Sequence, residues 1–446
     1  MDYTEAVRYL QTLGRELASP SHARAAKFDL KNSRVLAEKL GNPQNRFRSV
    51  HIAGTNGKGS TAAMVESILR HAGYRTGLYT SPHLERINER IRLDGAEISG
   101  TAFAEAFTRV HDCIETMLST GELGAHPTFF ECVTAMAFDV FARARVDFAV
   151  LETGMGGRLD STNIVTPEVA VITQIDFDHE SFLGHSIEEI AGEKAGIIKR
   201  DVPVVCAAQN SDAVRVIRKR AEELAAPLIE IDERYSVEAI PEKDGTYRAR
   251  VTDVADSSVI RFHVPLPGRH QVRNAITALA AARVLAAGAH VDDDAIAVGI
   301  ADVHWPGRLE RISERPLIYL DGTHNPAGAR ELAAFWDAHF RDRKIHLIYG
   351  AVRDKAVDEV AGLLFPRAAR VTVTAANQPR AISAAALAEI TGHNARELAV
   401  IPDAGEAFES ALRDAGPDDV IFVTGSLYLV GDMRRWWHGR ALAKAK

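Results

Sequence analysis

The sequence has little cysteine and no excess of positive charge. Its three cysteines, Cys113, Cys132 and Cys206, show neither a metal-ligand spacing nor a disulfide framework, and they fit a reducing compartment as small core residues. The formal net charge is −7. Non-specific binding to nucleic acid requires a basic face, so this function is not expected.

Long apolar runs are also missing. No stretch reaches the roughly 18–20 apolar residues of a transmembrane helix. The segment Met1–Ser19 has no apolar core and carries Arg8, Arg15 and Glu16, so we do not interpret it as a signal peptide. We therefore expect a cytoplasmic protein with no membrane partner and no nucleic-acid partner. Nothing in the sequence demands an oligomer, and a monomer is expected.

The order of apolar runs predicts an α/β protein. Between about residues 48 and 230, short apolar runs alternate with helical patterns, which favours a mostly parallel sheet covered on both faces. From Thr246 to Val264 the pattern has period two, which predicts a small antiparallel insertion. Trp305–Arg308 is a turn signal, after which strand–helix alternation restarts. We predict a P-loop-type first domain, residues 1–304, and a smaller Rossmann-like domain, residues 305–446.

Individual elements follow from the same patterns. The expected strands are Val50–Ala53, Thr76–Thr80, Phe148–Glu152, Val169–Thr173, Val202–Ala207, Leu317–Leu320, Ile345–Tyr349, Val371–Thr374 and Val420–Val423. The expected helices are Thr61–His71, Ala102–Leu118, Phe129–Ala144, Ser186–Ile197, Asp212–Leu224, Gln271–Ala287, Pro326–His339, Lys355–Leu364, Ser383–Glu389 and Gly405–Asp414.

The most informative segment is the glycine loop, Gly54-Thr-Asn-Gly-Lys-Gly-Ser60, between an apolar strand and a helix. Glycines let backbone N–H groups approach phosphate oxygens, and a helix N-terminus adds partial positive charge, so the layout is that of a phosphate cradle. The spacing is not the usual G-x-x-x-x-G-K-[ST], because Gly54 lies four residues before Lys58 rather than six. Lys58 would contact the β- and γ-phosphates. The alternative is a tight turn with a solvated lysine.

Polar residues follow two other strands of the first domain. Glu152 ends an apolar strand and enters a turn with three glycines, where a carboxylate can hold Mg²⁺ beside bound phosphates. Its alternative is an exposed carboxylate in a loop. Asp178 and His179 lie in a second cluster, residues 176–180, which makes a second metal ligand credible. A hydrogen-bonded loop histidine is the alternative there.

Three more segments stand out. Lys194 lies among small and apolar residues of a predicted helix, where a desolvated lysine would be reactive, although an ordinary surface lysine fits equally. The second domain opens with Leu320–Pro326, in which helix capping explains Asn325 but neither Asp321 nor His324. Ser81-Pro-His follows another strand. Polar clusters at strand ends of both domains indicate one cleft, the setting of an ATP-dependent enzyme that closes over its substrates.

Taken together, these segments resemble the folylpolyglutamate synthase/dihydrofolate synthase family within the wider Mur ligase group. The resemblance spans nearly the whole chain. Each piece is short, but the ordered set is highly specific. The matching pieces are Gly54–Ser60, Thr80–Leu84, Thr128–Glu131, Glu152–Asp160, Asp178–His179, Glu193–Gly196, His270–Asn274, Gly307–Arg308 and Asp321–Asn325.

The resemblance implies an ATP-binding Mur ligase-type first domain and a C-terminal glutamate-ligase domain. It implies an amide ligase that adds L-glutamate to a reduced folate, and to 7,8-dihydropteroate, through an acyl phosphate. One alternative is a Mur-type ligase acting on a different carboxylate. Another is a non-catalytic nucleotide-binding regulator. The sequence leaves open whether both glutamylation steps are carried out.

The resemblance also implies roles for individual residues. The catalytic residues would be Lys58, Glu152, His179 and Lys194. Two Mg²⁺ ions are expected, with Ser81, Glu152, His179 and a carbamylated Lys194 as ligands, whereas the generic P-loop rule would give the metal to Ser60. K⁺ stays open as a further cofactor. The nucleotide would contact Gly54, Thr55, Asn56, Gly57, Lys58, Gly59, Ser60, Asn274, Arg308, Asp321 and His324.

The acceptor substrate has its own set of residues in the same resemblance. Phe129 or Phe130 could stack on a flat pterin or aminobenzoate ring, and both could equally be helix core. The residues implied for this acceptor are Ser81, Pro82, His83, Thr128, Phe129, Phe130, Glu131, Leu159, Asp160 and Ser161.

Overall fold

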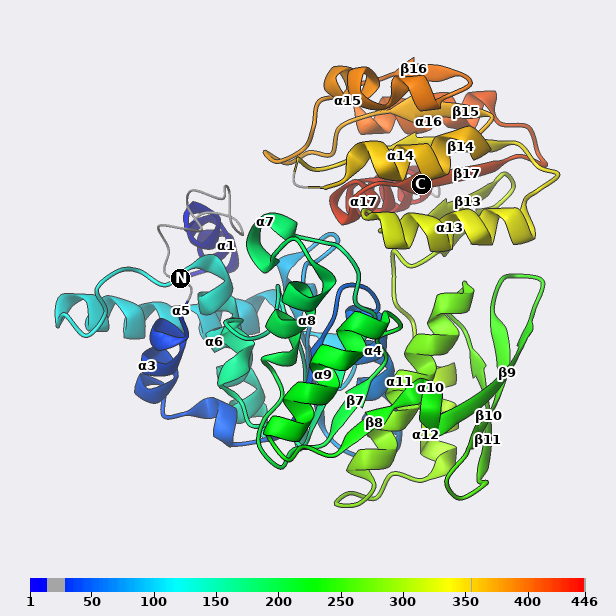
Figure 1. The fold of residues 1–446 in the computed structure, drawn as a ribbon. Coiled ribbons are helices and arrows are strands. Elements are labelled where there is room, and N and C mark those ends of the chain that lie inside the picture. The colour runs from blue at the N-terminus through cyan, green and yellow to red at the C-terminus, as the bar shows by residue number, and fades with distance from the viewer. Residues whose placement is uncertain (14–28, 354, 445–446) are drawn as a thin grey trace.

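The computed structural model describes residues 1–13, 29–353 and 355–444. Arg15 and Glu16, used above against a signal peptide, lie outside the described residues. Two α/β units follow each other along the chain and lie against one another, and a small antiparallel sheet lies beside the first (Figure 1). In the described ranges, no helix is long and apolar enough to cross a membrane.

The first unit is built on an eight-stranded sheet within the described residues. Six strands run parallel, and β3 and β4 form an antiparallel edge. Val150 and Leu151 belong to different core clusters because successive strand residues point to opposite faces. In sheet order the strands are β4 (Ala96–Glu97), β3 (Ile91–Leu93), β2 (Thr76–Tyr79), β5 (Phe148–Glu152), β1 (Arg48–Ala53), β6 (Val169–Ile172), β7 (Val204–Cys206) and β8 (Leu228–Glu230).

Helices cover both faces of this sheet, as a buried parallel sheet requires. One face packs against α4 (Lys58–His71), α11 (Arg269–Leu285) and α12 (Asp293–Ala301). The other face packs against α1 (Tyr3–Thr12), α3 (Lys31–Lys39), α5 (Gly100–Ser119), α6 (Phe129–Ala144), α8 (Ile187–Ala195) and α9 (Ser211–Glu223). Short helical turns complete the unit: η1 (Pro43–Asn45), η2 (Ile87–Arg90), η3 (Ser161–Ile164), α7 (Glu180–Leu183) and α10 (Ile231–Arg234).

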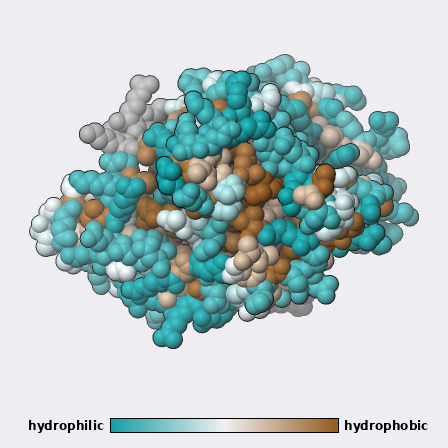
Figure 2. All heavy atoms as spheres, turned by 60° about the horizontal axis from the view of Figure 1, so that its bottom comes forward, coloured by the Kyte–Doolittle hydropathy of each residue, from teal (hydrophilic) through white to brown (hydrophobic). Residues whose placement is uncertain are grey.

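The predicted antiparallel insertion is present and longer than expected. It consists of β9 (Tyr235–Pro241), β10 (Tyr247–Asp253) and β11 (Val259–Val264). Alternate residues such as Val251 and Phe262 pack into the core under α11 and α12. The molecular surface is mostly hydrophilic on the face drawn in Figure 2, with hydrophobic side chains gathered near its middle.

The second unit has a six-stranded sheet in the described part of the chain, parallel except for β12. In sheet order its strands are β12 (Glu310–Glu314), β13 (Leu317–Leu320), β17 (Val420–Thr424), β14 (Ile345–Tyr349), β15 (Arg370–Val373) and β16 (Leu398–Val400). Its helices are α13 (Pro326–His339), α14 (Val357–Leu364), α15 (Ala384–Thr391), α16 (Ala404–Asp414) and α17 (Leu427–Lys444), with turns η4 (Phe365–Arg367) and η5 (Gly392–Asn394).

The predicted fold class is confirmed, and every predicted strand is present within one or two residues of its expected bounds. The helices expected at Thr61–His71 and Lys355–Leu364 begin instead at Lys58 and Val357. Short or polar elements such as α3 and β16 escaped the sequence patterns. The predicted boundary near residue 304 falls between α12 and β12 and stays a prediction.

Candidate functional site

The glycine loop joins β1 to α4 at the carboxyl edge of the first sheet. Gly54 and Gly57 have φ values of +155° and +86°, which favour glycine. A Cβ atom on Gly54 would lie 1.8 Å from Thr173 Oγ1, and one on Gly57 would lie 2.3 Å from Asn274 Oδ1. The loop therefore requires glycine at both positions, and Asn274 of α11 lies directly against it.

Two lysines converge on this loop. Lys58 donates to the carbonyl oxygens of Gly54 (3.1 Å) and Thr55 (3.3 Å), and Lys194 of α8 donates to the same Gly54 oxygen at 2.8 Å. Lys194 is 3% exposed, so it is not a surface lysine. Burial and the charge of Lys58 lower the pKa of Lys194 to about 7. A substantial fraction of its amine is therefore neutral near pH 7.

Glu152, at the end of β5, is a buried carboxylate beside the loop. Its Oε2 accepts a hydrogen bond from the backbone N–H of Ser81 at 3.1 Å. A Cβ atom on Gly59 would lie 3.6 Å from the same oxygen. Burial raises the pKa of Glu152, while the charges of Lys58 and Arg308 and the Ser81 hydrogen bond act in the opposite direction. Ser81 and the glycine loop thus meet at this carboxylate.

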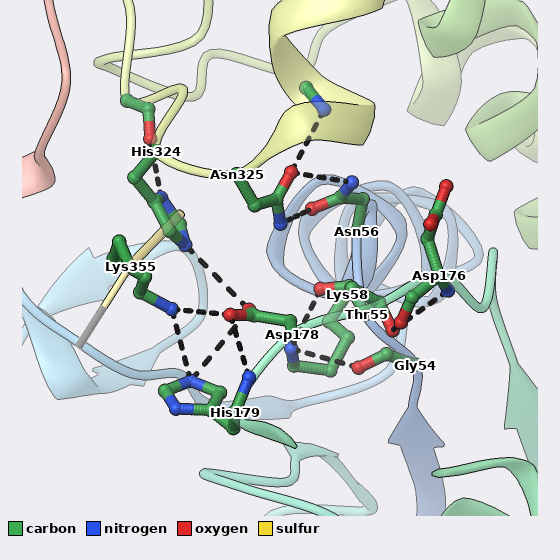
Figure 3. Close-up of polar contacts among 12 residues, drawn as sticks. Gly54, Thr55, Asn56, Lys58, Asp176, Asp178, His179, His324, Asn325 and Lys355 are labelled. Atoms are coloured by element: carbon green, nitrogen blue, oxygen red, sulfur yellow. Dashed lines mark hydrogen bonds and ion pairs between the residues drawn. The ribbon is translucent and has the colours of Figure 1, made fainter. Parts of the chain in front are cut away.

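A second polar cluster joins the two units (Figure 3). Lys355, between β14 and α14, donates to Asp178 Oδ1 at 2.6 Å, and its Nζ lies 3.3 Å from His179 Nε2. His324 Nε2 lies 3.9 Å from Asp178 Oδ2. Burial alone would raise the pKa of Asp178, but the charges of His179, Lys355 and His324 together hold it below its usual range. Burial, helped by Lys355, lowers the pKa of His324 to about 4.

Two further contacts cross between the units at the same place. Asn56 of the glycine loop donates to Asn325 Oδ1 at 3.2 Å, and Asn325 donates to Asn56 Oδ1 at 2.9 Å. The same Oδ1 of Asn325 accepts from Gly328 N–H at 2.8 Å, which caps α13 as the sequence predicts. Arg330 of α13 donates to Asp176 Oδ2 at 2.9 Å. The second unit therefore rests directly on the glycine loop and on residues 176–179.

Asp321 binds backbone N–H groups of two segments, one before β12 and one after β13. Its carboxylate accepts hydrogen bonds from the N–H groups of Leu309 (2.9 Å) and Thr323 (3.0 Å). His324 Nδ1 lies 2.8 Å from the Gly322 carbonyl oxygen. These bonds fix two neighbouring turns, the one before β12 that carries Arg308 and the one after β13 that carries His324.

Some of the residues expected to line an acceptor site support the local structure, and others are accessible side chains. Thr128 and Glu131 form a capping box that starts α6, and Phe129, 6% exposed, lies in the core. Phe130 is less buried and packs against Gly154, where a Cβ atom would lie 2.5 Å from the ring. Asp160 Oδ2 accepts from the N–H groups of Gly154 (2.8 Å) and Met155 (3.0 Å). Asp160 and the capping box thus support the loops, and Phe130 is the more accessible ring.

Ser161 is buried beside this loop, whereas Leu159 is partly exposed. His83 Nδ1 accepts a hydrogen bond at 3.0 Å from Arg90, a buried arginine that also lies over the Phe129 ring. Arg90 and His83 therefore connect the loop after β2 to the start of α6.

A cavity of about 450 Å³ opens between the two units. Ser81 and Glu152 line it from the first unit and Arg308 from the second, with Trp305 on the connecting segment. Within the described ranges, no three His, Cys, Asp or Glu side chains form a group that could hold a metal ion. Ser81 lies against Glu152 at the cavity, whereas His179 lies in the cluster of Asp178 and Lys355, and the predicted set of metal ligands stays a prediction.

The fold and this site define a ligase of the Mur class. A phosphate-type loop with two lysines and a buried carboxylate lies under a second α/β unit, and two family models match in the same order. The Mur ligase middle domain matches residues 52–282, and the Mur ligase glutamate ligase domain matches residues 307–427.

Within this class, the chain belongs to the dihydrofolate synthase/folylpolyglutamate synthase family. It is 38% identical to the dihydrofolate synthase/folylpolyglutamate synthase of Bacillus subtilis, over 92% of this chain and 95% of that protein. It is 36% identical to the folylpolyglutamate synthase of Lacticaseibacillus casei, over 98% of both. The predicted family is confirmed, and neither alternative function gains support.

Solved structures agree with this assignment. A Mycobacterium tuberculosis folylpolyglutamate synthase complexed with ADP and AMPPCP superposes with a TM-score of 0.87 and 33% identity, covering 98% of this chain and 99% of that one. Escherichia coli FolC in complex with DHPP and ADP superposes with a TM-score of 0.86 and 29% identity, covering 98% of each chain.

Proposed function

We propose that this protein uses ATP to join L-glutamate to the carboxylate of a reduced folate, and also to 7,8-dihydropteroate, with release of ADP and phosphate. The observation that carries the proposal is the meeting of Lys58, Lys194 and Glu152 at a glycine loop, in a chain similar over nearly its whole length to synthases of this name. Both acceptor classes come from the names of these relatives.

The chemistry explains why such residues are needed. A carboxylate is a poor electrophile, because its leaving group would be oxide. Attack by the acceptor carboxylate on the γ-phosphorus breaks the bond to ADP and gives an acyl phosphate. The amine of glutamate then attacks the acyl carbon, loses a proton, and phosphate leaves. Lys58 would offset the repulsion between the γ-phosphate and the incoming carboxylate.

Oxygen donors at Ser81 and Glu152 fit Mg²⁺. The Glu152 carboxylate has no direct ion pair among the described residues, and Ser81 lies against it. These two residues and His179 would hold the ion, which would neutralise phosphate charge. His179 would have to exchange its present contact with Lys355. Ser81 lines the cavity together with Glu152, whereas Ser60 is buried in α4, which supports Ser81 rather than Ser60 as the hydroxyl ligand.

Lys194 as a carbamate is a further part of the proposal. Carbamylation needs a neutral amine, and burial supplies one at a pKa of about 7. The carbamate would support a second Mg²⁺. A high-resolution crystal structure with metal and CO₂ present, in which the density ends at a bare Nζ, would count against it. No described residue has been assigned to K⁺, and a monomer in the cytoplasm stays a prediction.

For the acceptor, we assign the ring contact to Phe130 rather than Phe129, because Phe129 is core. For the nucleotide, Asn274 lies against Gly57 of the glycine loop, Arg308 lines the cavity, and His324 lies 3.9 Å from Asp178. Asp321 would act by fixing the turn of Arg308.

The test is phosphate release from ATP with three mixtures: dihydropteroate plus glutamate, tetrahydrofolate plus glutamate, and glutamate alone. The first two are expected to release phosphate, and mass spectrometry should find products heavier by one glutamyl residue. No activity with either pterin would refute the proposed function. Activity with one alone would define which of the two steps the protein performs.

A further inference from the structure

The loop that carries Ser81 is a single hydrogen-bonded body. The two carboxylate oxygens of Glu89 accept from three successive backbone N–H groups, those of residues 84–86, at 2.7, 2.8 and 2.7 Å. Ser81, five residues before Arg86 in this loop, donates its own N–H to Glu152. Thr80, the residue before Ser81, donates its N–H to the carbonyl oxygen of Arg90 at 3.1 Å, so the chain on both sides of Ser81 is tied to the short helix η2 that carries Glu89.

This loop is held by an arginine of the second unit. Arg434 of α17 donates from Nε to both oxygens of Glu310 at 2.9 and 3.2 Å, and from Nη1 to Glu85 Oε1. The side chains of Arg434, Glu310 and Glu85, here named the Arg434 cluster, are 22, 11 and 17% exposed. One cation thus separates two largely buried carboxylates. Without it, two like charges would face each other away from water.

A backbone contact lies beside the Arg434 cluster. Gly431, in the interior of α17, packs on Leu84, and a Cβ atom there would lie 2.0 Å from the Leu84 carbonyl oxygen. A Cβ atom on Gly307 would lie 3.2 Å from the Leu84 side chain. Glycine destabilises the interior of a helix relative to alanine. The close approach of Leu84 explains why glycine is nevertheless needed at position 431. The second unit therefore contacts the loop in two ways, through the ion pair of Arg434 with Glu85 and through the close packing of Gly431 on Leu84.

The Arg434 cluster also forms part of the wall of the cavity between the units. Glu85 and Arg434 line it together with Ser81, Glu152 and Arg308. The loop on which the first unit presents Ser81 is consequently the one that the second unit holds.

We infer that Arg434 is a positioning residue, which acts through Glu85 to set Ser81 against Glu152 only while the second unit is docked on the first. The inference rests on the proposed function, in which Ser81 and Glu152 hold Mg²⁺. It makes assembly of that ligand pair depend on the contact between the two units.

The first experiment needs no catalysis. Hydrogen exchange of peptides covering residues 80–90 is measured by mass spectrometry in the full chain, for the wild type, Arg434→Met and Arg440→Met. Arg440 is the matched control, because it lies on the same helix and its carboxylate partner, Glu409, belongs to the same unit. Faster exchange is expected in Arg434→Met alone. Unchanged exchange in that variant, or an equal rise in Arg440→Met, overturns the inference.

The second experiment measures the Mg²⁺ requirement of the reaction. Arg434→Met is expected to raise the Mg²⁺ concentration for half-maximal rate by roughly 10- to 100-fold, while kcat at saturating Mg²⁺ is largely kept. Glu85→Gln should raise it too, and the double variant should be no worse than Arg434→Met, because both act by one route. Additive losses, or an unchanged Mg²⁺ requirement, overturn the inference. An inactive wild type would instead refute the proposed function, and hydrogen exchange would still decide the contact.

Discussion

The two units present the same local design, a strand, a glycine-containing turn and a helix, and they use it in opposite ways. In the first unit, α4 begins after Gly57, and no side chain caps its N-terminus. In the second, Asn325 caps α13 and Pro326 follows at its first turn, where proline has no N–H to offer. The first helix leaves its N–H groups available to an anion, whereas in the second the Asn325 side chain already accepts from Gly328 N–H and Pro326 has no N–H.

The two sheet edges therefore serve different purposes. We call the edge at the N-terminus of α4, which has no side-chain cap, the open edge, and the edge at the N-terminus of α13, which Asn325 caps, the closed edge. The open edge gathers Lys58, Lys194 and Glu152 around a loop suited to phosphate. The closed edge offers Asn325 as a contact surface for that loop. The presence of the Asn325 cap on α13 and the absence of a side-chain cap on α4 therefore distinguish the contact surface from the phosphate-type loop.

The largest expected effect comes from removing the cation of the open edge. Lys58→Ala should reduce turnover by at least roughly a thousandfold while the protein stays folded, because the γ-phosphate then loses the lysine that would offset its repulsion of the incoming carboxylate. Glu152→Ala is expected to be as severe. Steady-state phosphate release and circular dichroism check both, with exposed Lys219→Ala as the control. Wild-type rates in either variant would contradict the site.

The next effect tests whether the cradle depends on its glycine. Gly57→Ala introduces a Cβ atom that would lie 2.3 Å from Asn274 Oδ1, in a residue with φ +86°. The strain is worth about 1–3 kcal/mol, so the Kd for ATP should rise by roughly tenfold or more. Isothermal titration calorimetry measures it.

Gly73→Ala is a close control, because Gly73 follows the same helix with φ +89°, and a Cβ atom added there would have no neighbouring atom within 4 Å. It should cost stability and leave ATP binding unchanged. Equal losses of ATP affinity in the two variants would mean that general strain, and not the contact with Asn274, is responsible.

A buried histidine lies on a central strand of each unit, and the two differ in their partners. His51 of β1 is 0% exposed and its Nε2 lies 2.8 Å from Thr162 Oγ1, whereas His346 of β14 lies 3.0 Å from Asp419. Burial lowers the pKa of His51 to about 3, from an ordinary value of 6.5. Below pH 6.5 the unfolded chain binds a proton that the folded chain refuses, so stability falls as the pH decreases.

The loss is at most about 1.4 kcal/mol for each pH unit over that window. Denaturant unfolding at several pH values measures it in the wild type and in His51→Gln. The substitution should flatten the dependence of the free energy of unfolding on pH. An unchanged slope would show that His51 takes up its proton in the folded state.

Local features of this site could be predicted from the sequence because short-range physics decides them. The glycine loop, the strand before it and the cap at Asn325 each depend on neighbouring residues, and the structure contains all three. The family motifs also located Glu152 and Lys194. They did not give the direction of the carboxylates: Asp321 and Asp160 each accept a hydrogen bond from a backbone N–H group of their own loop.

Contacts between the units escaped prediction for a different reason. The sequence pattern places Lys355 at the start of a helix, and nothing around it marks it as the partner of Asp178. Arg434 likewise pairs with Glu85, 349 positions away. Such pairs depend on how the sheets of the two units pack against one another, which hydrophobic periodicity and motif spacing do not encode.

The smallest expected effect separates the two roles of Asn325. Asn325→Ala removes the cap of α13 and the contact with Asn56, and should lower the free energy of unfolding by about 1 kcal/mol. Asn325→Asp keeps an oxygen for Gly328 N–H and a charge that suits a helix N-terminus, but it has no N–H for Asn56 Oδ1. Its stability should therefore stay near that of the wild type.

Both variants should weaken ATP binding by about 0.5–1.5 kcal/mol, or roughly two- to tenfold, since one hydrogen bond to the glycine loop is lost. Denaturant unfolding and calorimetric titration distinguish the roles. If Asn325→Asp is as unstable as Asn325→Ala, the cap is not what closes the second edge, and if ATP binds both variants normally, the contact with Asn56 does not shape the cradle.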